Sequence, residues 1–145
     1  MTEPIPPTPH ETPSRRHLRL GLWGLCVFVS LGAVLEALHG FKVGIYLDAN
    51  QDARRFMWRL AHAHGTLLSL FNVVFALLAR RWPSERAARL PIASGSLAAA
   101  TVLLPVGFFL GGIFTHGGDP GLGVLLVPIG AALLLLALVL TALSV

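Results

Sequence analysis

The stretch WRLAHAHGTLLSLFNVVFALLAR, residues 58–80, decides the fold class of this chain. Between Arg59 and Arg80 it holds an apolar run long enough for a helix across the hydrocarbon core of a bilayer, which takes about 20 residues. Three further apolar runs of similar length occur in the chain. The expected membrane spans are residues 18–39, 58–79, 91–115 and 121–144.

The composition supports a membrane protein. Of the 145 residues, 54% are hydrophobic and only 12% are charged, whereas a soluble domain carries about 25% charged residues. Backbone polar groups in lipid must be satisfied within the spanning segment, and these runs are too long and too uniformly apolar for barrel strands. The sequence therefore predicts an all-α fold, an integral membrane four-helix bundle.

The first 14 residues, MTEPIPPTPHETPS, differ from the rest of the chain. Their prolines block helix formation and favour an extended, solvated chain. We expect a disordered, Pro-rich cytoplasmic tail over residues 1–14 and a single four-helix transmembrane domain over residues 15–145. The first apolar run begins only at Leu18 and is too long for the apolar core of a secretory signal, so cleavage is not expected.

Basic residues are divided unequally between the two sides of the expected bundle. One side carries Arg15, Arg16, Arg19, Arg80, Arg81, Arg86 and Arg89, and the other carries Lys42, Arg54, Arg55 and Arg59. Because basic residues are retained in the cytoplasm, we expect both termini there, with the protein in a bacterial inner membrane. The net charge of +4 then reflects topology, and nucleic acid is not an expected partner. Trp23, Trp82, Tyr46 and Trp58 are expected at the two membrane interfaces as aromatic belts.

Alternation of four spans would gather histidine and carboxylate residues at one membrane face. The end of the first span, the start of the second and the end of the third all carry such residues. Neutral imidazoles and carboxylates are ligands of zinc, copper, iron and nickel. The candidate metal site consists of Glu36, His39, His62 and His116, with His64 and Asp119 as further candidates.

Helical periodicity predicts which side of each span faces its neighbours. At 100° per residue, small and polar residues form one stripe on each of the first three spans, and such stripes mark helix–helix interfaces in membranes. Ser69, Asn72 and Thr101 lie in these stripes and are expected to form interhelical hydrogen bonds. His62 and His64 point about 200° apart on a regular helix, so only His62 is expected to face the bundle interior.

The histidine cluster is open to several interpretations. It could bind a transition metal ion, two histidines on facing helices could ligate haem b, or a Glu/His chain could carry protons. His39 and His116 at helix C-termini could instead satisfy exposed carbonyl groups. His17 stands alone among arginines at the opposite face and receives no role.

Several short motifs resemble a known family. GAVLEALHGFK, residues 32–42, resembles the A-H-G-x-K signature that ends helix one in a family of small four-span membrane proteins of unknown function. HAHGTLLSL, SGSL and PIG resemble the segments of that family in helices two, three and four. The resemblance implies four helices, with His39, Gly40 and Lys42 as signature positions and His62 as the helix-two histidine. It implies no activity.

The leading functional hypothesis is a small, non-enzymatic membrane protein that binds a transition metal ion or haem b through the His/Glu cluster. The alternatives are a small transporter or proton-coupled subunit, and a membrane oxidoreductase component. The sequence has no Walker loop, CxxC motif or Ser–His–Asp set that would indicate a soluble-type enzyme. Expected partners are membrane lipids, together with a second copy of the chain or another membrane protein.

Overall fold

The computed structural model describes residues 11–47 and 52–144. The long helices are α1 (Glu11–Gly40), α3 (Asp52–Ala79), α4 (Arg89–Ile113) and α5 (Leu126–Ala142). Short helices occupy the connections: α2 (Gly44–Leu47), η2 (Ser84–Arg86) and η3 (Leu122–Leu125). Across these two ranges there is no strand, only an isolated bridge between His116 and Asp119. The prediction of an all-α four-helix bundle is confirmed.

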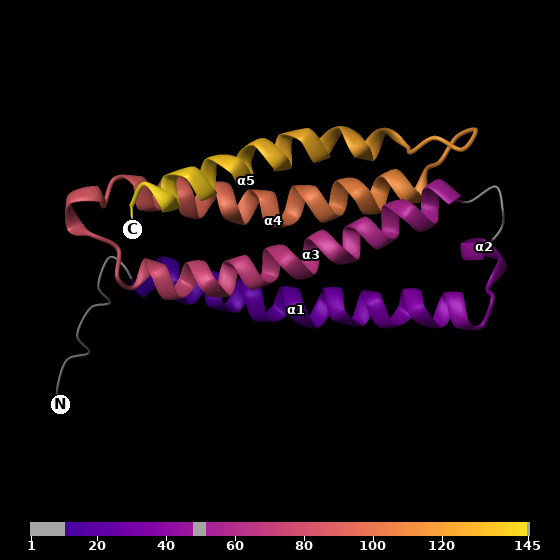
Figure 1. The fold of residues 1–145 in the computed structure, drawn as a ribbon, viewed down its shortest axis with the longest axis horizontal. Helices are drawn as coiled ribbons and strands as arrows, with labels where there is room; N and C mark the ends of the chain where they lie inside the picture. The colour runs from indigo at the N-terminus through magenta and orange to yellow at the C-terminus, as the bar shows by residue number, and fades with distance from the viewer. Residues whose placement is uncertain (1–10, 48–51, 145) are drawn as a thin grey trace, which may run out of the picture.

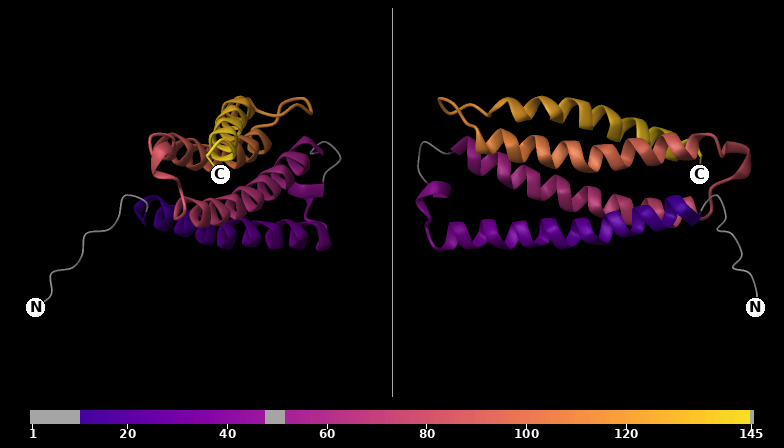
Figure 2. Two further views of the ribbon diagram at one scale, coloured as in Figure 1. Left: turned by 60° about the vertical axis from the view of Figure 1, so that its left-hand side comes forward. Right: turned by 180° about the vertical axis from the view of Figure 1, so that it is seen from behind.

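The long helices run up and down in chain order (Figure 1). α1 packs against α3, α3 against α4 and α4 against α5, whereas contact between α1 and α4 is slight. The start of α1, the η2 segment and the end of α5 lie together at one end of the bundle, and α2 and the α4–α5 connection lie at the other (Figures 1 and 2). We call these the terminal end and the loop end.

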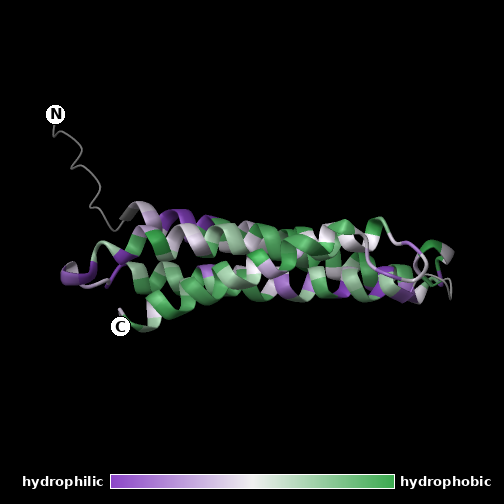
Figure 3. Cartoon of the chain, turned by 90° about the horizontal axis from the view of Figure 1, so that it is seen from above, coloured by the Kyte–Doolittle hydropathy of each residue, from purple (hydrophilic) through white to green (hydrophobic). Residues whose placement is uncertain are grey.

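Four helices in the described part of the chain are long and apolar enough to cross a membrane: Thr12–Gly40, Asp52–Ala79, Arg89–Ile113 and Leu122–Ala142. Hydrophilic residues gather mainly towards the two ends, and the middle of the bundle is mainly hydrophobic (Figure 3). Most of the apolar stretch of α4 is buried, whereas those of α1 and α5 are largely exposed. Lipid would cover these exposed faces, so the structure supports a multi-pass membrane protein.

The predicted tail over residues 1–14 ends too late, because α1 already begins at Glu11. Glu11–Ser14 form the first turn of α1, not part of an extended tail. Pro13 does not prevent this, because the first turn of a helix lacks intrahelical acceptors for its N–H groups. Ser14 anchors the turn, since its buried hydroxyl donates a hydrogen bond to the Ala76 carbonyl at 2.8 Å. The expected tail over residues 1–10 lies outside the described residues.

Glycines allow α1 and α3 to approach closely. A Cβ at Gly21 would lie 2.7 Å from the Ser69 carbonyl oxygen, and a Cβ at Gly24 would overlap the Ser69 hydroxyl. The same small-against-large pairing continues along the interface, with the His62 ring over Gly32 and the Phe28 ring over Gly65. Close packing of this kind stabilises helix pairs in lipid, where the hydrophobic effect does not drive association.

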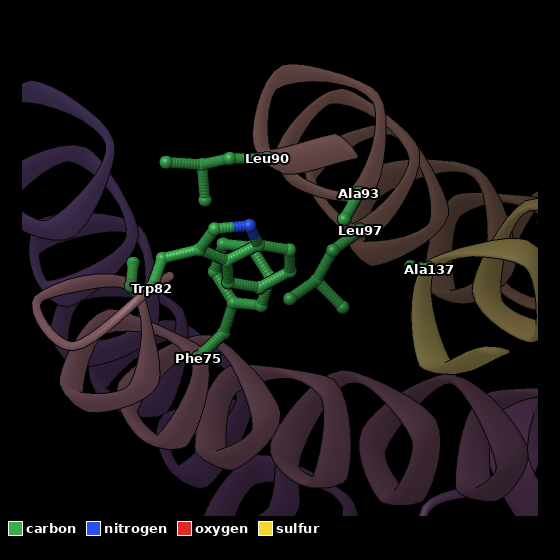
Figure 4. Close-up of a cluster of buried hydrophobic side chains, with 7 residues drawn as sticks. Phe75, Trp82, Leu90, Ala93, Leu97 and Ala137 are labelled. Carbon is green, nitrogen blue, oxygen red and sulfur yellow. The ribbon is translucent and has the colours of Figure 1, made fainter. Parts of the chain in front are cut away.

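Two apolar clusters hold α3 and α4 together. At the terminal end, the Phe75 and Trp82 rings lie between these helices with centroids 6.0 Å apart (Figure 4). The cluster is completed by Ala79 of α3, by Leu90, Ala93 and Leu97 of α4, and by Ala137 of α5. The second cluster, nearer the loop end, contains Met57, Ala61, Leu68, Leu104 and Phe108.

Three of the four aromatic residues expected in interfacial belts lie inside the bundle. Tyr46 and Trp82 are buried, and Trp58 stacks on Phe109 with centroids 5.6 Å apart. Only Trp23, whose surface is 72% exposed, faces outward. Nearness to a helix end sets the depth of a side chain in the membrane, but the helical phase sets the direction in which it points.

Candidate functional site

A pocket of about 910 Å³ opens between α1 and α3 at the loop end, and we call it the α1–α3 pocket. Its charged and polar lining consists of Glu36, His39, Tyr46, Arg55, Arg59 and His62. Gly32, Leu35, Phe56, Leu60 and Ala63 supply the remaining surface. Three of the four principal metal-ligand candidates therefore line one pocket, although the pocket itself was not predicted.

Helical spacing explains why these charged residues share the pocket. Glu36 and His39 are three residues apart on α1, and Arg55, Arg59 and His62 are separated by four and three residues on α3. Residues three or four apart lie on the same face of a helix. Each helix thus presents one polar stripe to the pocket at the end where α1 and α3 are joined.

The end of α1 and the short helix α2 place Tyr46 against this pocket. Val43 N–H donates to the Leu38 carbonyl at 3.0 Å and Lys42 N–H to the His39 carbonyl at 3.1 Å, and Lys42 has a positive φ of 52°. This is the Schellman pattern that reverses the chain after a helix. Tyr46 consequently lies between the His39 and Trp58 rings, with centroid distances of 6.5 and 6.3 Å.

Positive charge exceeds negative charge in the lining of the pocket. Among the described residues, the lining contains two guanidinium groups, Arg55 and Arg59, and one carboxylate, Glu36. Arg55 also donates to the Leu47 carbonyl at 3.4 Å and forms an ion pair with Asp52. Because the Asp52 side chain is largely exposed and does not line the pocket, this pair contributes only about 0–1 kcal/mol to stability.

His62 is oriented by the backbone of α1. Its Nδ1 lies 2.7 Å from the Phe28 carbonyl oxygen, which can only accept, so Nδ1 carries the hydrogen. The ring packs over Gly32, which has no side chain to displace it. Nε2 is then left to accept a hydrogen bond from a ligand while the ring is neutral.

The other candidate ligands do not join this pocket. His64 Nδ1 bonds to the Leu60 carbonyl of its own helix at 2.9 Å, and its ring lies 4.8 Å from that of Phe108. His116 and Asp119 are exposed in the α4–α5 connection, where their backbones pair with each other. Among the described residues, no three His, Cys, Asp or Glu side chains are grouped closely enough to hold a metal ion. The predicted convergence of all four principal ligands, with two more nearby, is not present.

The C-terminal carbonyls of α4 accept hydrogen bonds from Arg54 of α3, not from His116. Arg54 Nε donates to the Gly112 carbonyl at 3.0 Å, and another guanidinium nitrogen donates to the Ile113 carbonyl at 3.4 Å. The guanidinium also lies 5.8 Å from the centre of the Trp58 ring. Arg54 thus provides the cationic helix cap that the sequence assigned to histidine.

Sequence reasoning missed a buried polar cluster at the terminal end, which we call the His17 network. His17 is fully buried, and it joins α1 to two other helices. Its Nδ1 lies 2.6 Å from Asn72 Oδ1 on α3, and its Nε2 lies 2.8 Å from Ser94 Oγ on α4. Asn72 Nδ2 in turn donates to Thr101 Oγ1 at 2.7 Å, so both residues form an interhelical hydrogen bond, although the sequence did not predict that they bond to each other. Ser69 instead donates to the Gly65 carbonyl of its own helix.

The network determines its own hydrogen positions. Asn72 Nδ2 donates to both the Leu68 carbonyl and Thr101, so its Oδ1 faces His17 as an acceptor. His17 Nδ1 must therefore carry a hydrogen, and Nε2 accepts from the Ser94 hydroxyl. Every polar group of the imidazole and the amide has a partner, which is what burial in an apolar environment requires.

A signal for the network is present in the sequence of α1. Ser14, His17, Gly21 and Gly24 follow a spacing of three, four and three residues, and Phe28 and Leu35 continue it. A 3–4 spacing places residues along the seam between two packed helices. The arginines in the same turns made this segment look like a charged helix end. They lie on the opposite face of the helix, so they do not interrupt the buried stripe.

Comparison of the chain with protein-family models, with curated proteins and with solved structures finds no match. Fold and composition define a class, the four-helix multi-pass membrane proteins, and the resemblance to the small four-span family stays a prediction. A fold would not define the activity in any case, because function depends on the side chains of a site.

Proposed function

We propose that this protein is a membrane-embedded binding protein for a small amphipathic anion, held in the α1–α3 pocket. The observation that carries this proposal is the pair of guanidinium groups, Arg55 and Arg59, beside apolar side chains in one pocket of about 910 Å³. Pockets for small molecules span about 300–1,000 Å³ and combine apolar surface with a few placed polar groups.

The lining indicates which chemistry the ligand should have. The planar guanidinium of Arg59 can bind a carboxylate or phosphate through two parallel hydrogen bonds. Leu35, Phe56 and Leu60 offer apolar surface for a short hydrocarbon part. Glu36 opposes a second negative charge, so a monoanion fits better than a dianion.

The metal-ion function expected from the sequence has less support, and haem binding stays a prediction. A transition metal needs three or four ligands at bonding distance, and the described residues bring no such group together. Roles in transport, proton coupling or electron transfer stay predictions, because each would need a path beyond the pocket.

Ligand-dependent thermal unfolding in a mild, uncharged detergent tests the proposal. Acetate, butyrate and hexanoate are titrated at constant pH and ionic strength, with butylamine and hexylamine as cationic counterparts. We expect saturable stabilisation by the carboxylates, with affinity rising about fourfold per buried methylene. Stabilisation by the amines and not by the carboxylates would contradict the assignment.

Two substitutions at the loop end separate specific binding from a general charge effect. Arg59→Gln should weaken hexanoate binding about 10–100-fold, the range for a lost charge-assisted hydrogen bond. Lys42→Gln removes the same charge at the same end, but Lys42 does not line the pocket, so affinity should change less than about twofold through screened long-range charge alone. Equal losses of hexanoate affinity in both variants would contradict a specific site, because general positive potential at this end would then explain the binding.

A further inference from the structure

A second hollow lies at the opposite end of the bundle, between α1 and α4. It has a volume of about 710 Å³, and we call it the α1–α4 groove. α1 contributes Thr12, Arg15, Arg16, Arg19, Leu20 and Trp23, and α4 contributes Ala98 and Val102. The slight contact between these two helices leaves the groove open along its side.

The arginines of the groove take no part in the packing of α1 against α3. Arg15, Arg19 and Trp23 follow one another at intervals of four residues, so they form a line along one face of the helix. His17 and Gly21 lie on the other face and make the bundle contacts. All three arginines are exposed, and no acidic residue is among the described residues that line the groove.

The groove changes from cationic to apolar along the helix axis. α1 has 30 residues and a length of about 45 Å, which exceeds the hydrocarbon core of about 30 Å. The arginines occupy the first third of α1, where the headgroups would lie. Trp23 follows one turn deeper, and Val27 of α1 and Val102 of α4 expose apolar side chains beyond it.

We propose that the α1–α4 groove binds an anionic glycerophospholipid. The guanidinium groups of Arg15 and Arg19 hold the phosphate, and one acyl chain lies along Trp23 and Val102. Guanidinium groups match phosphate oxygens in geometry and charge, and basic pockets between membrane helices on the cytoplasmic side bind acidic headgroups. A choline headgroup would bring its own cation against three arginines, so a net negative lipid is favoured.

Native mass spectrometry of the full chain tests this inference. The protein in mild detergent is titrated with phosphatidylglycerol or with phosphatidylcholine carrying the same acyl chains. We expect phosphatidylglycerol to bind about 25-fold more tightly, since Arg15 and Arg19 should each contribute about fivefold near an acidic headgroup. Equal binding of the two lipids overturns the proposal.

Two further arms locate the site and identify the bound chemistry. Arg15→Gln with Arg19→Gln should remove the preference for phosphatidylglycerol. Arg81→Gln with Arg86→Gln lowers the charge equally at the same end, outside the groove, and should retain it. Arg89 still donates to the Leu143 carbonyl in that control. Thermal unfolding verifies that both double variants are folded. Competition by millimolar inorganic phosphate would overturn the lipid assignment, because the site would then bind the free anion.

The lipid proposal does not depend on the proposed ligand of the α1–α3 pocket. The two sites lie at opposite ends of the bundle and share no lining residue. Hexanoate should therefore leave the phosphatidylglycerol preference unchanged, and Arg59→Gln should leave it intact. Loss of lipid preference in Arg59→Gln would contradict the location of the lipid site.

Discussion

At the scale of single residues, His17 shows how an imidazole can hold helices together without binding a ligand. Its two nitrogens join Asn72 of α3 and Ser94 of α4, and the side chain is fully buried. Ser14, one turn earlier, donates to the Ala76 carbonyl and accepts a hydrogen bond from Arg80. Polar groups buried away from water are costly unless paired, so these contacts restrict how α1 can rotate and slide against its neighbours.

The first prediction concerns the hydrogen bond between His17 and Asn72. His17→Ala and Asn72→Ala should each destabilise the bundle by about 1–3 kcal/mol, because each leaves a buried partner unpaired. The coupling energy in a double-mutant cycle should be about 0.6 kcal/mol and at most about 1.7 kcal/mol, the average and the maximum for polar pairs in membrane helices. Equilibrium unfolding in mixed micelles measures all four proteins.

His116→Ala provides the control for that cycle, since His116 is exposed in the α4–α5 connection. Its stability should stay within about 0.5 kcal/mol of the parent protein. A coupling energy of zero between His17 and Asn72 would mean that the two side chains contribute independently.

At the scale of elements, α1 has one face that packs against α3 and another that lines the α1–α4 groove. One face follows the 3–4 spacing and packs its glycines against α3, and the other presents arginines and Trp23 to the α1–α4 groove. Glycine is normally unfavourable inside a helix. Its occurrence at the α1–α3 interface is explained by the close approach of the two backbones.

The second prediction compares two glycines that meet different surroundings. Gly21→Ala should destabilise the bundle by about 1–3 kcal/mol, because the new Cβ would lie 2.7 Å from a backbone oxygen that cannot move freely. Gly95→Ala on α4 meets nothing within 4 Å and should stabilise by up to about 1 kcal/mol through helix propensity. The same unfolding assay measures both, and similar effects would show that close packing does not limit Gly21.

At the scale of the whole molecule, the up-and-down path decides which connections share a membrane face. The turn after α1 and the α4–α5 connection lie at the loop end, whereas η2 lies with the termini at the other end (Figure 1). The arginine distribution favours the terminal end in the cytoplasm. The α1–α3 pocket would then face the opposite compartment.

The third prediction tests this topology by labelling single cysteines in intact cells. Cys26 is the only native cysteine, so Cys26→Ala provides the background. Phe41→Cys and His116→Cys should react with a membrane-impermeant maleimide from outside, and Ser84→Cys should react only after lysis. Opposite accessibility of positions 41 and 116 would exclude the four-crossing path, and the reverse pattern at all three positions would invert the orientation.

The sequence accounted for part of the candidate site. Asn72 and Thr101 were identified from helical phase, because small and polar residues in lipid must face another helix. The same phase separated His62 from His64, which are indeed directed to different surroundings. The convergence of His116 with Glu36 could not be decided this way, because it depends on how far apart the helix ends stand and not on the face that they share.

By itself, the sequence determined the number of long apolar helices, because hydropathy and segment length are properties of local segments. Only the tertiary structure decided which polar side chains meet. The orientation of α1 about its axis places His17 against α3 and α4 and directs the neighbouring arginines outward. The space between α1 and α3 places Arg55, Arg59 and Glu36 around one pocket. Such encounters depend on packing between helices distant along the chain, which no single segment encodes.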